Sequence, residues 1–268
     1  MGRKGDELRR YMRTFAITRA VSPALNQCAL THLARQPINI PRAIEQHAAY
    51  EDSLRSLGVE IRRAPPAADL ADSVFVEDAA IVLDEIAVIT RPGAASRRAE
   101  TEGVAAVLAE YRPLIHLQSP CTLDGGDVLR IGRMLYVGCS SRTNAQAVDA
   151  LQSLLKPYDY RVIPVTVTGC LHLKSAVTAI GEQILLVNPR WLGEIDFGGA
   201  ERVEIDAGEL YAANALRVGS TLIYPSHFPR TLEKLQAKGL PVTTVECDEL
   251  AKAEGAVTCC CILLNVTQ

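Results

Sequence analysis

One pattern recurs along this chain and limits the folds it can adopt: a tight hairpin, then a helix, then a single strand. Apolar alternation and two-residue turn signals predict four hairpins. They span residues 79–91 (turn 84–85), 127–137 (turn 132–133), 175–187 (turn 181–182) and 213–224 (turn 219–220). These starts, and a fifth at Val257, lie roughly 38 to 48 residues apart, a period typical of propellers and other repeat folds.

The two ends of the chain predict how the repeat closes. The fifth hairpin opens at Val257 and runs to the C-terminus, so its strand needs the N-terminal strand at 14–19 as a partner. Such pairing closes the units into a ring, and residues at equivalent positions then converge on its axis. We expect the chemistry of the protein to lie there.

Helical periodicity and end signals place the remaining elements. Helices are predicted at 42–57, 98–111, 144–155 and 229–238, with only a short element at 189–192 in the fourth unit. Single strands are predicted at 59–63, 114–117, 160–165, 202–205 and 242–245. Because no linker or change in composition interrupts the pattern, we expect one domain over 14–268, preceded by a flexible polar lead-in over 1–13.

The bulk composition indicates a globular protein. The chain has 268 residues, 48% of them hydrophobic, and a net charge near −3 with mixed signs. This charge gives no electrostatic reason to expect nucleic acid or an acidic membrane as a partner. No apolar run reaches the roughly 20 residues of a membrane span, and residues 1–7 lack the apolar core of a secretory signal. We therefore expect a cytoplasmic location.

Eight cysteines require an interpretation. None forms a CxxC pair, which argues against a structural zinc site. Reduced, buried thiols are the default in a chain without an export signal. The run Cys259-Cys260-Cys261 lies on a predicted strand, so Cys259 and Cys261 should share one face and Cys260 the other. An alternative is a metal site at this triplet with help from His172.

Five segments lie just before the hairpins or at their first residues: 72–78, 124–127, 172–174, 211–214 and 254–259. Four of the five carry ionisable groups among apolar residues. A thiol with a pKa of about 8.5 is mostly protonated at neutral pH, so a nucleophilic Cys259 would need a nearby cation. His172 can donate a proton to a leaving amine and later take one from water, and Asp124 can orient its ring.

Three further acids favour a cationic substrate. Asp72, Glu77 and Asp78 suit a planar guanidinium group, which pairs with carboxylates through two hydrogen bonds. Each residue also has a purely structural interpretation: His172 and Cys259 as core residues, and Asp124-Gly-Gly-Asp127 as a turn into a hairpin. Because these residues all lie at equivalent positions before their hairpins, we favour a functional role over a structural one.

Six motifs, in this order, resemble the dimethylarginine dimethylaminohydrolase family of the guanidine-modifying superfamily. They are DSVFVED (72–78), ITRPGAASRR (89–98), LDGGD (123–127), SRTN (141–144), LHLKS (171–175) and VTCC (257–260). The resemblance extends from about residue 17 to 264. It implies an α/β fold: a five-bladed α/β-propeller of ββαβ repeats with pseudo-fivefold symmetry, closed by the N- and C-terminal strands.

The resemblance also implies roles for individual residues. Cys259 would be the nucleophile, His172 the general acid and base, and Asp124 its carboxylate partner. The implied substrate contacts involve seven residues: Asp78 with Glu77 for the guanidinium, Asp72 with the Leu30 carbonyl for the α-ammonium, Arg97 and Arg142 for the α-carboxylate, and the Ala253 carbonyl to complete the pocket. No cofactor or resident metal is expected, and a homodimer is one open assembly state.

The activity implied is hydrolysis of Nω-methylated L-arginine to L-citrulline and a methylamine, through an S-alkylthiouronium on Cys259. Two alternatives stay open. One is another guanidine-modifying enzyme, of the arginine deiminase or amidinotransferase type. The other is a non-catalytic protein that binds an amino acid or a metal on the same scaffold.

Overall fold

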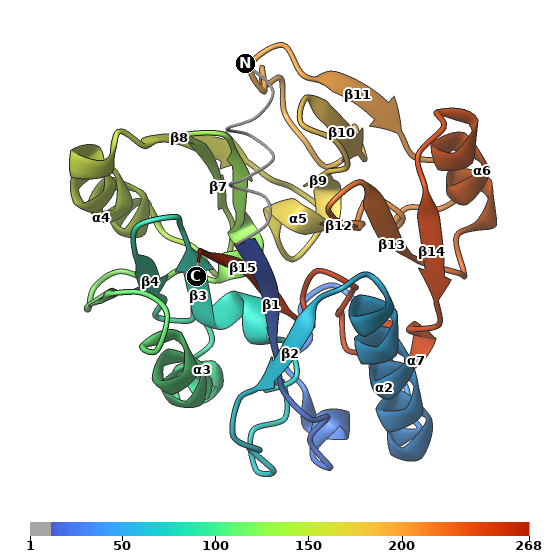
Figure 1. Ribbon diagram of the computed structural model, residues 1–268, viewed down its shortest axis with the longest axis horizontal. Helices are drawn as coiled ribbons and strands as arrows, with labels where there is room; N and C mark the ends of the chain where they lie inside the picture. Colours follow the sequence, from blue (N-terminus) through green and yellow to red (C-terminus); the bar gives the residue numbers. More distant parts are fainter. Residues whose placement is uncertain (1–11, 268) are drawn as a thin grey trace.

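Five small sheets make up the computed structural model, which describes residues 12–267. Each sheet has three strands, a central strand that pairs with one antiparallel and one parallel neighbour. Figure 1 shows the sheets arranged around a common centre. The strands are β1 (Met12–Thr18), β2 (Glu60–Arg63), β3 (Ala80–Val82), β4 (Ala87–Ile89), β5 (Leu114–His116), β6 (Val128–Ile131), β7 (Met134–Cys139), β8 (Arg161–Thr166), β9 (Val177–Ala179), β10 (Ile184–Val187), β11 (Glu201–Glu204), β12 (Leu216–Val218), β13 (Thr221–Pro225), β14 (Val242–Val245) and β15 (Ile262–Thr267).

The four predicted hairpins are confirmed with their turns. Ile131 pairs with Met134 and Val218 with Thr221, so each of these two hairpins has a two-residue turn. Gly132 and Gly219 start the two turns with positive φ angles of 59° and 61°, which favour glycine because it lacks a Cβ atom. Local turn chemistry therefore sets the hairpins.

The fifth sheet closes the ring as predicted. β15 pairs antiparallel with β1, with Ala16 opposite Leu263, and β1 pairs in parallel with β2. Met12 and Arg13 already belong to β1, so the predicted lead-in over 1–13 is wrong for these two residues. Residues 1–11 of that lead-in lie outside the described residues. The predicted α/β fold of five related units is confirmed, with a helix before the last strand in four of them. The single domain over 14–268 stays a prediction.

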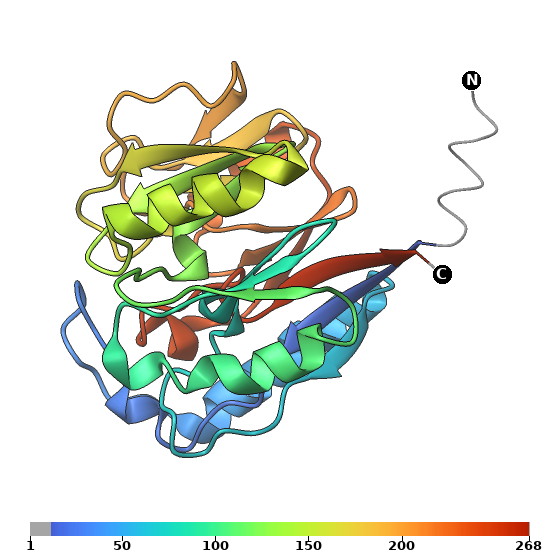
Figure 2. The ribbon, with the colours of Figure 1, turned by 90° about the vertical axis from the view of Figure 1, so that its left-hand side faces the viewer.

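The long helices lie outside the sheets (Figure 1), and Figure 2 shows two of them, α3 and α4, side-on. Asn39 and Asn144 cap α2 and α4 by accepting a backbone N–H with their side chains. Leu151 and Leu155 of α4 pack in one core cluster with Leu135 of β7. The long helices are α2 (Ile40–Ser56), α3 (Glu100–Leu108), α4 (Ala145–Leu155) and α6 (Pro229–Ala237); the one-turn helices α5 (Leu173–Ala176) and α7 (Asp248–Ala251) are shorter.

The fourth unit differs from the others between β10 and β11. Residues 188–200 contain turns and bends but no helix, although a short element at 189–192 was predicted. Pro189 and three glycines in this stretch disfavour a helix, and Trp191 packs against Tyr211 with ring centroids 5.0 Å apart.

A single turn precedes the first strand of each hairpin, and these turns bring the predicted chemistry to the centre. They are the 3₁₀ turns η2 (Val76–Ala79) and η4 (Gly125–Asp127), helix α5, and the turns at 210–213 and 257–260. The predicted strand through Cys259 is therefore wrong: β15 begins only at Ile262. The N–H groups of Cys259 and Cys261 donate to the carbonyls three residues earlier, so strand-like alternation does not apply.

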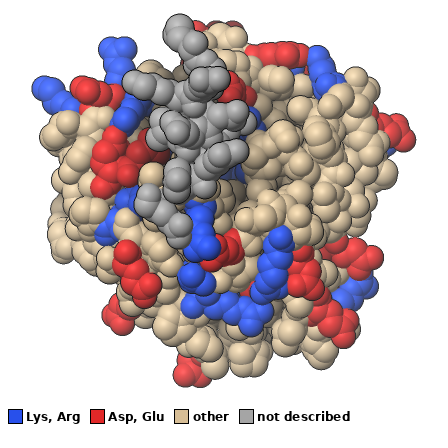
Figure 3. Space-filling model, in the orientation of Figure 1, with Lys and Arg blue, Asp and Glu red and all other residues tan. Residues whose placement is uncertain are grey.

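Charges of both signs are interspersed on the molecular face in Figure 3. The helices of residues 12–267 are all too short or too polar to cross a bilayer.

Candidate active site

Seven of the predicted site residues line one small cavity at the centre of the ring. Its volume is about 10 Å³, which is roughly the space for one water molecule. The seven residues are Asp72, Asp78, Arg97, Arg142, His172, Ala253 and Cys259. The thiol near the C-terminus and the imidazole from the middle of the chain therefore face the same space, as the closed ring requires.

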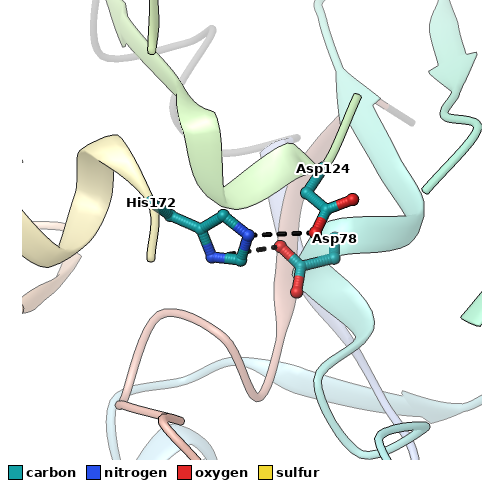
Figure 4. A group of neighbouring side chains, drawn as sticks. All are labelled: Asp78, Asp124 and His172. Carbon is teal, nitrogen blue, oxygen red and sulfur yellow. Dashed lines mark hydrogen bonds and ion pairs between the residues drawn. The ribbon is translucent and has the colours of Figure 1, made fainter. Parts of the chain in front are cut away.

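His172 lies between two carboxylates, as Figure 4 shows. Its Nε2 atom is 3.0 Å from Asp124 Oδ2, and its Nδ1 atom is 3.9 Å from Asp78 Oδ1. Burial disfavours the protonated imidazole, but the carboxylates of Asp78, Asp124 and Asp127 outweigh burial and raise the pKa of His172 to about 9. His172 is therefore an imidazolium at neutral pH and can donate a proton.

The two glycines after Asp124 let η4 approach this histidine. A Cβ atom on Gly126 would lie 2.7 Å from His172 Nδ1 and 2.8 Å from Asp78 Oδ1. A Cβ atom on Gly125 would lie 2.0 Å from the carbonyl oxygen of Glu77. The Asp124-Gly-Gly motif is therefore more than a turn into a hairpin, because the close contact between Asp78 and His172 depends on it.

Cys259 is partly buried at the edge of the same cavity. Burial, followed by the negative charges of Glu77 and Asp78, raises the pKa of its thiol far above the ordinary value. The thiol is therefore protonated at neutral pH. A cation placed between the thiol and Asp78 would reverse this electrostatic effect.

Arg97 is held by acidic partners in the protein itself. Its Nη1 atom donates to Asp78 Oδ2 at 2.6 Å, and its Nη2 atom donates to Glu100 Oε2 at 3.0 Å. Burial opposes ionisation of Asp78, yet His172 and Arg97 lower its pKa to about 2. Burial raises the pKa of Glu100 to about 7 despite Arg97. Glu100 was missed by the sequence interpretation, although it lies three residues after Arg97.

Arg142 presents an unsatisfied donor at the cavity. Its Nη2 atom is 3.3 Å from Thr31 Oγ1, and its Nη1 atom is 3.5 Å from Asp124 Oδ2. The second contact has the distance of an ion pair but not hydrogen-bond geometry, and no atom of residues 12–267 accepts a hydrogen bond from this buried Nη1. An anionic ligand group would satisfy it.

Asp72 and the loop before α2 form another wall. The Asp72 carboxylate accepts the N–H of Ala29 at 3.0 Å, and burial raises the pKa of this carboxyl although Arg97 opposes the shift. Ala29 lines the cavity, whereas Leu30 is not among its lining residues. The predicted contact of the Leu30 carbonyl with substrate stays a prediction, as does that of the Ala253 carbonyl.

Glu77 points away from the cavity. Its carboxylate accepts hydrogen bonds from Lys174 Nζ at 2.7 Å and from Thr258 Oγ1 at 2.8 Å. All three residues line a second cavity, of about 260 Å³, whose lining includes neither Asp78 nor His172. This geometry does not support a direct contact between Glu77 and the guanidinium, so the predicted contact stays untested.

Glu254 was not among the predicted site residues, yet it holds the loop over the cavity. Its carboxylate accepts the N–H groups of Thr31, His32 and Leu33, and its own φ angle is 59°. Residues 29–33 are called the lid below. A non-glycine residue with a positive φ angle at a site points to a functional role, but the sequence alone does not reveal this angle.

A metal site at the cysteine triplet receives no support. Within residues 12–267, the one group of three side chains close enough to share a metal is Asp78, Asp124 and His172. This group contains no cysteine; Arg97 pairs with Asp78, Arg142 lies beside Asp124, and His172 lies within ion-pair distance of both carboxylates. All eight cysteines are free; five are buried, and Cys139 is exposed.

A ring of five related α/β units, with a thiol, an imidazole and carboxylates facing one central cavity, defines the class of guanidine-modifying enzymes. Residues 21–196 match the family model described as "N,N dimethylarginine dimethylhydrolase, eukaryotic". The chain belongs to the dimethylarginine dimethylaminohydrolase family.

Relatives with this name support the assignment over nearly the whole chain. A dimethylarginine dimethylaminohydrolase of Streptomyces coelicolor is 39% identical over 93% of this chain and 96% of its own length. One from Pseudomonas aeruginosa is 34% identical over 81% of this chain and 87% of its own length. The solved structure of a cysteine-to-serine mutant of the Pseudomonas aeruginosa enzyme, complexed with citrulline, has a TM-score of 0.89 at 32% identity, and the match covers 93% of this chain and 98% of that one.

Proposed function

We propose that this protein hydrolyses Nω-methylated L-arginine to L-citrulline and a methylamine. The observation that carries the proposal is the shared cavity of Cys259 and His172, with carboxylates and an unsatisfied arginine donor in its walls. Relatives named dimethylarginine dimethylaminohydrolase, one of them solved with citrulline, support the substrate class.

The substrate is a zwitterion with an additional cationic group, and the cavity has a counterpart for each charge. The guanidinium lies against Asp78, which is ionised at neutral pH because its pKa is about 2. The α-carboxylate meets the free Nη1 of Arg142, with Arg97 beside it, and the α-ammonium meets Asp72. The cavity of about 10 Å³ cannot hold an arginine, so we infer that the lid opens for entry.

In the first half of the reaction, the positive charge of the substrate activates the thiol. The guanidinium lowers the pKa of the Cys259 thiol, whose proton leaves to solvent. The thiolate attacks the guanidino carbon, and the bond from this carbon to the methylated nitrogen breaks. His172 donates its proton to the departing amine, which leaves an S-alkylthiouronium on Cys259.

The second half regenerates the thiolate. His172, now neutral, removes one proton from the water that attacks the same carbon. The C–S bond then breaks, Cys259 leaves as a thiolate, and the remaining hydroxyl proton passes to solvent as citrulline forms. Asp124 stabilises the imidazolium that forms again, because its Oδ2 atom lies 3.0 Å from Nε2. Every step in this sequence uses side chains of this chain and water.

A citrulline-forming assay on a small panel tests the proposal. We expect turnover of asymmetric dimethylarginine and monomethylarginine, and little or none of L-arginine. Equal or faster release of citrulline from L-arginine would instead favour an arginine deiminase, and transfer of the amidino group to an added amine would favour an amidinotransferase. No product from any guanidine, with a ligand-dependent rise in melting temperature, would indicate a binding protein.

The cytoplasmic location and the homodimer also stay proposals. Support for the location is the state of the eight cysteines, all of them free, as is usual in a reducing compartment. Sedimentation of the purified protein would decide the assembly state, and cell fractionation would decide the location.

A further inference from the structure

A partly buried hydrogen-bond network joins the turns of all five units on the side of the ring centre that faces away from His172. Lys174 Nζ donates to Glu77 Oε1 at 2.7 Å and to the carbonyl of Gly125 at 3.2 Å. Thr258 donates to Glu77 Oε2, and Asn214 contacts both Lys174 and Thr258. We call these five residues, Glu77, Gly125, Lys174, Asn214 and Thr258, the hub network.

Neighbouring residues in the sequence divide between the hub network and the reaction cavity. Glu77 and Thr258 line the cavity of about 260 Å³, whereas Asp78 and Cys259, the next residue in each case, line the cavity of about 10 Å³. The backbone N–H of Glu77 also donates to the carbonyl of Cys259 at 3.1 Å. The hub network is therefore the direct support of the nucleophile.

The side chain of Asn214 makes two hydrogen bonds to Thr258, the residue before the nucleophile. Its Oδ1 atom accepts the N–H of Thr258 at 3.1 Å, and its Nδ2 atom donates to Thr258 Oγ1 at 2.9 Å. Nδ2 also donates to the carbonyl of Lys174 at 3.1 Å. Asn214 as a residue is 3% exposed, so water cannot replace these bonds without rearrangement.

The direction of these bonds fixes the Thr258 hydroxyl. Because Oγ1 accepts from Asn214, its hydrogen is free to donate to Glu77 Oε2, which lies 2.8 Å away. Thr258 is thus held at its backbone N–H and its side chain, and Cys259 is held at its carbonyl. These bonds fix the backbone from which the Cys259 side chain projects.

We infer that Asn214 is a positioning residue for the nucleophile, acting through Thr258 on the orientation of Cys259. The inference rests on the proposed role of Cys259 in the reaction. It also accounts for the unit of β12, β13 and β14, whose turn contributes no group to the proposed chemistry: this unit supplies Asn214 at the position equivalent to the catalytic segments.

The Asn214→Ala variant tests this inference. We expect kcat to fall roughly 10- to 100-fold, because a displacement of about 1 Å at a reacting atom has effects of this size. KM should stay within about twofold of the wild type, because Asp72 and Arg142 do not contact the hub network. A kcat within twofold of the wild type would overturn the inference.

Asn188→Ala is the matched control. Asn188 is also buried, donates with Nδ2 to the Leu210 carbonyl at 2.8 Å and accepts the N–H of Arg190, but it does not contact Thr258. The Asn188→Ala variant should keep kcat near the wild-type value, even if its melting temperature falls as much as that of Asn214→Ala. An equal loss of kcat in both variants would mean that Asn214 is merely structural.

A double-mutant cycle tests whether Asn214 acts through Thr258. Thr258→Val removes the hydroxyl at nearly constant shape, and Thr258→Ser restores it. We expect Thr258→Ser to keep most of kcat, and the double variant Asn214→Ala/Thr258→Val to lose little more than the worse single variant. If the fold loss of kcat in the double variant equals the product of the two single losses, the two residues act independently, which would contradict the inference.

Alkylation of Cys259 by iodoacetamide gives a readout that needs no substrate. Loosening the turn should expose the partly buried thiol, so we expect its modification in Asn214→Ala to be at least about threefold faster than in the wild type and in Asn188→Ala. Equal rates would overturn the positioning role. If the wild type forms no citrulline, the proposed function fails, while the alkylation rates still decide the role of Asn214.

Discussion

The two sides of the ring centre differ in how fully their polar groups are satisfied. On the hub side, Glu77 has a cation and a hydroxyl as partners, and every donor of the Asn214 amide in the network has an acceptor. On the cavity side, Arg142 retains a free Nη1 and the thiol of Cys259 is held neutral. One side is complete within the protein, and the other becomes complete only with a ligand.

This difference shows how one fold can hold a stabilising network on one side of the ring centre and reactive groups on the other. A single helical turn before each hairpin presents consecutive residues to opposite sides, such as Glu77 and Asp78. The ion pair of Glu77 holds the turns together, while Asp78 faces the reaction cavity, where Arg97 also donates to it. Variants on the two sides should therefore have different kinetic effects.

The largest effect is expected from the thiol. Cys259→Ala should lower kcat at least about 10,000-fold, because no other side chain in the cavity can form the covalent intermediate. Cys260→Ala removes the adjacent, buried thiol, which does not line the cavity, and should keep most of the activity. Citrulline assays compare the two, and comparable losses would contradict the assignment of the nucleophile.

The next largest effect is expected from the partner of His172. Asp124→Asn should lower kcat roughly 1,000-fold, since the imidazolium loses the carboxylate 3.0 Å from Nε2. It should also lower the pKa of His172 from about 9, because Asp124 is one of the groups that raise it. The alkaline limb of the rate profile then moves to lower pH; an unchanged limb would exclude His172 as the proton donor.

The same shift predicts how stability depends on pH. The folded-state pKa of His172, about 9, lies above its ordinary value of 6.5. Its ion pairs therefore contribute stability that is fully present below pH about 6.5 and is lost as the pH rises through about 9. Denaturant titrations of wild type and Asp124→Asn should show this loss at lower pH in the variant.

A smaller effect is expected from the carboxylate-binding arginine. Arg142→Ala should raise KM roughly 100-fold and change kcat much less, because a charge-assisted contact to the substrate is worth a few kcal/mol. Arg217→Ala is the matched control, since Arg217 lines the cavity on the hub side and not the reaction cavity. Steady-state kinetics separate them, and a normal KM in Arg142→Ala would argue against the proposed orientation of the substrate.

The smallest effect is expected from the lid. Glu254→Gln replaces a charged acceptor of three lid N–H groups with a neutral one, so the closed lid should lose roughly 1 kcal/mol of stability. We expect KM to rise about threefold to tenfold at nearly constant kcat. A fall in kcat with unchanged KM would mean that Glu254 acts on the reaction and not on the lid.

The fold was largely predictable because its signals are local. Gly132 and Gly219 mark their turns, and Asn144 marks the start of α4 within a few residues. The turn at Cys259 was not predictable, because residues 257–264 are mostly apolar and are typical of a strand. Its geometry depends on Asn214 and Glu77, which lie 44 and 181 residues from Thr258 in the sequence.

The candidate site was predictable in its members but not in their arrangement. Motifs identified Asp78, Arg97 and His172, yet nothing local indicates that Glu77 turns to Lys174 while Asp78 faces the cavity. Glu254 has no local signal at all, because its partners in the lid lie 221 to 223 residues away. Such contacts arise only when the ring closes.

The most direct test of the central claim is the ionisation of Cys259 with and without a cation in the cavity. The ultraviolet absorbance of the thiolate, taken as the difference between wild type and Cys259→Ser, reports it. At about pH 7 we expect no thiolate signal in the free protein and a clear signal once a guanidinium-bearing amino acid is added. A full thiolate signal without ligand, or none with ligand bound, would contradict a nucleophile that is activated by the charge of its own substrate.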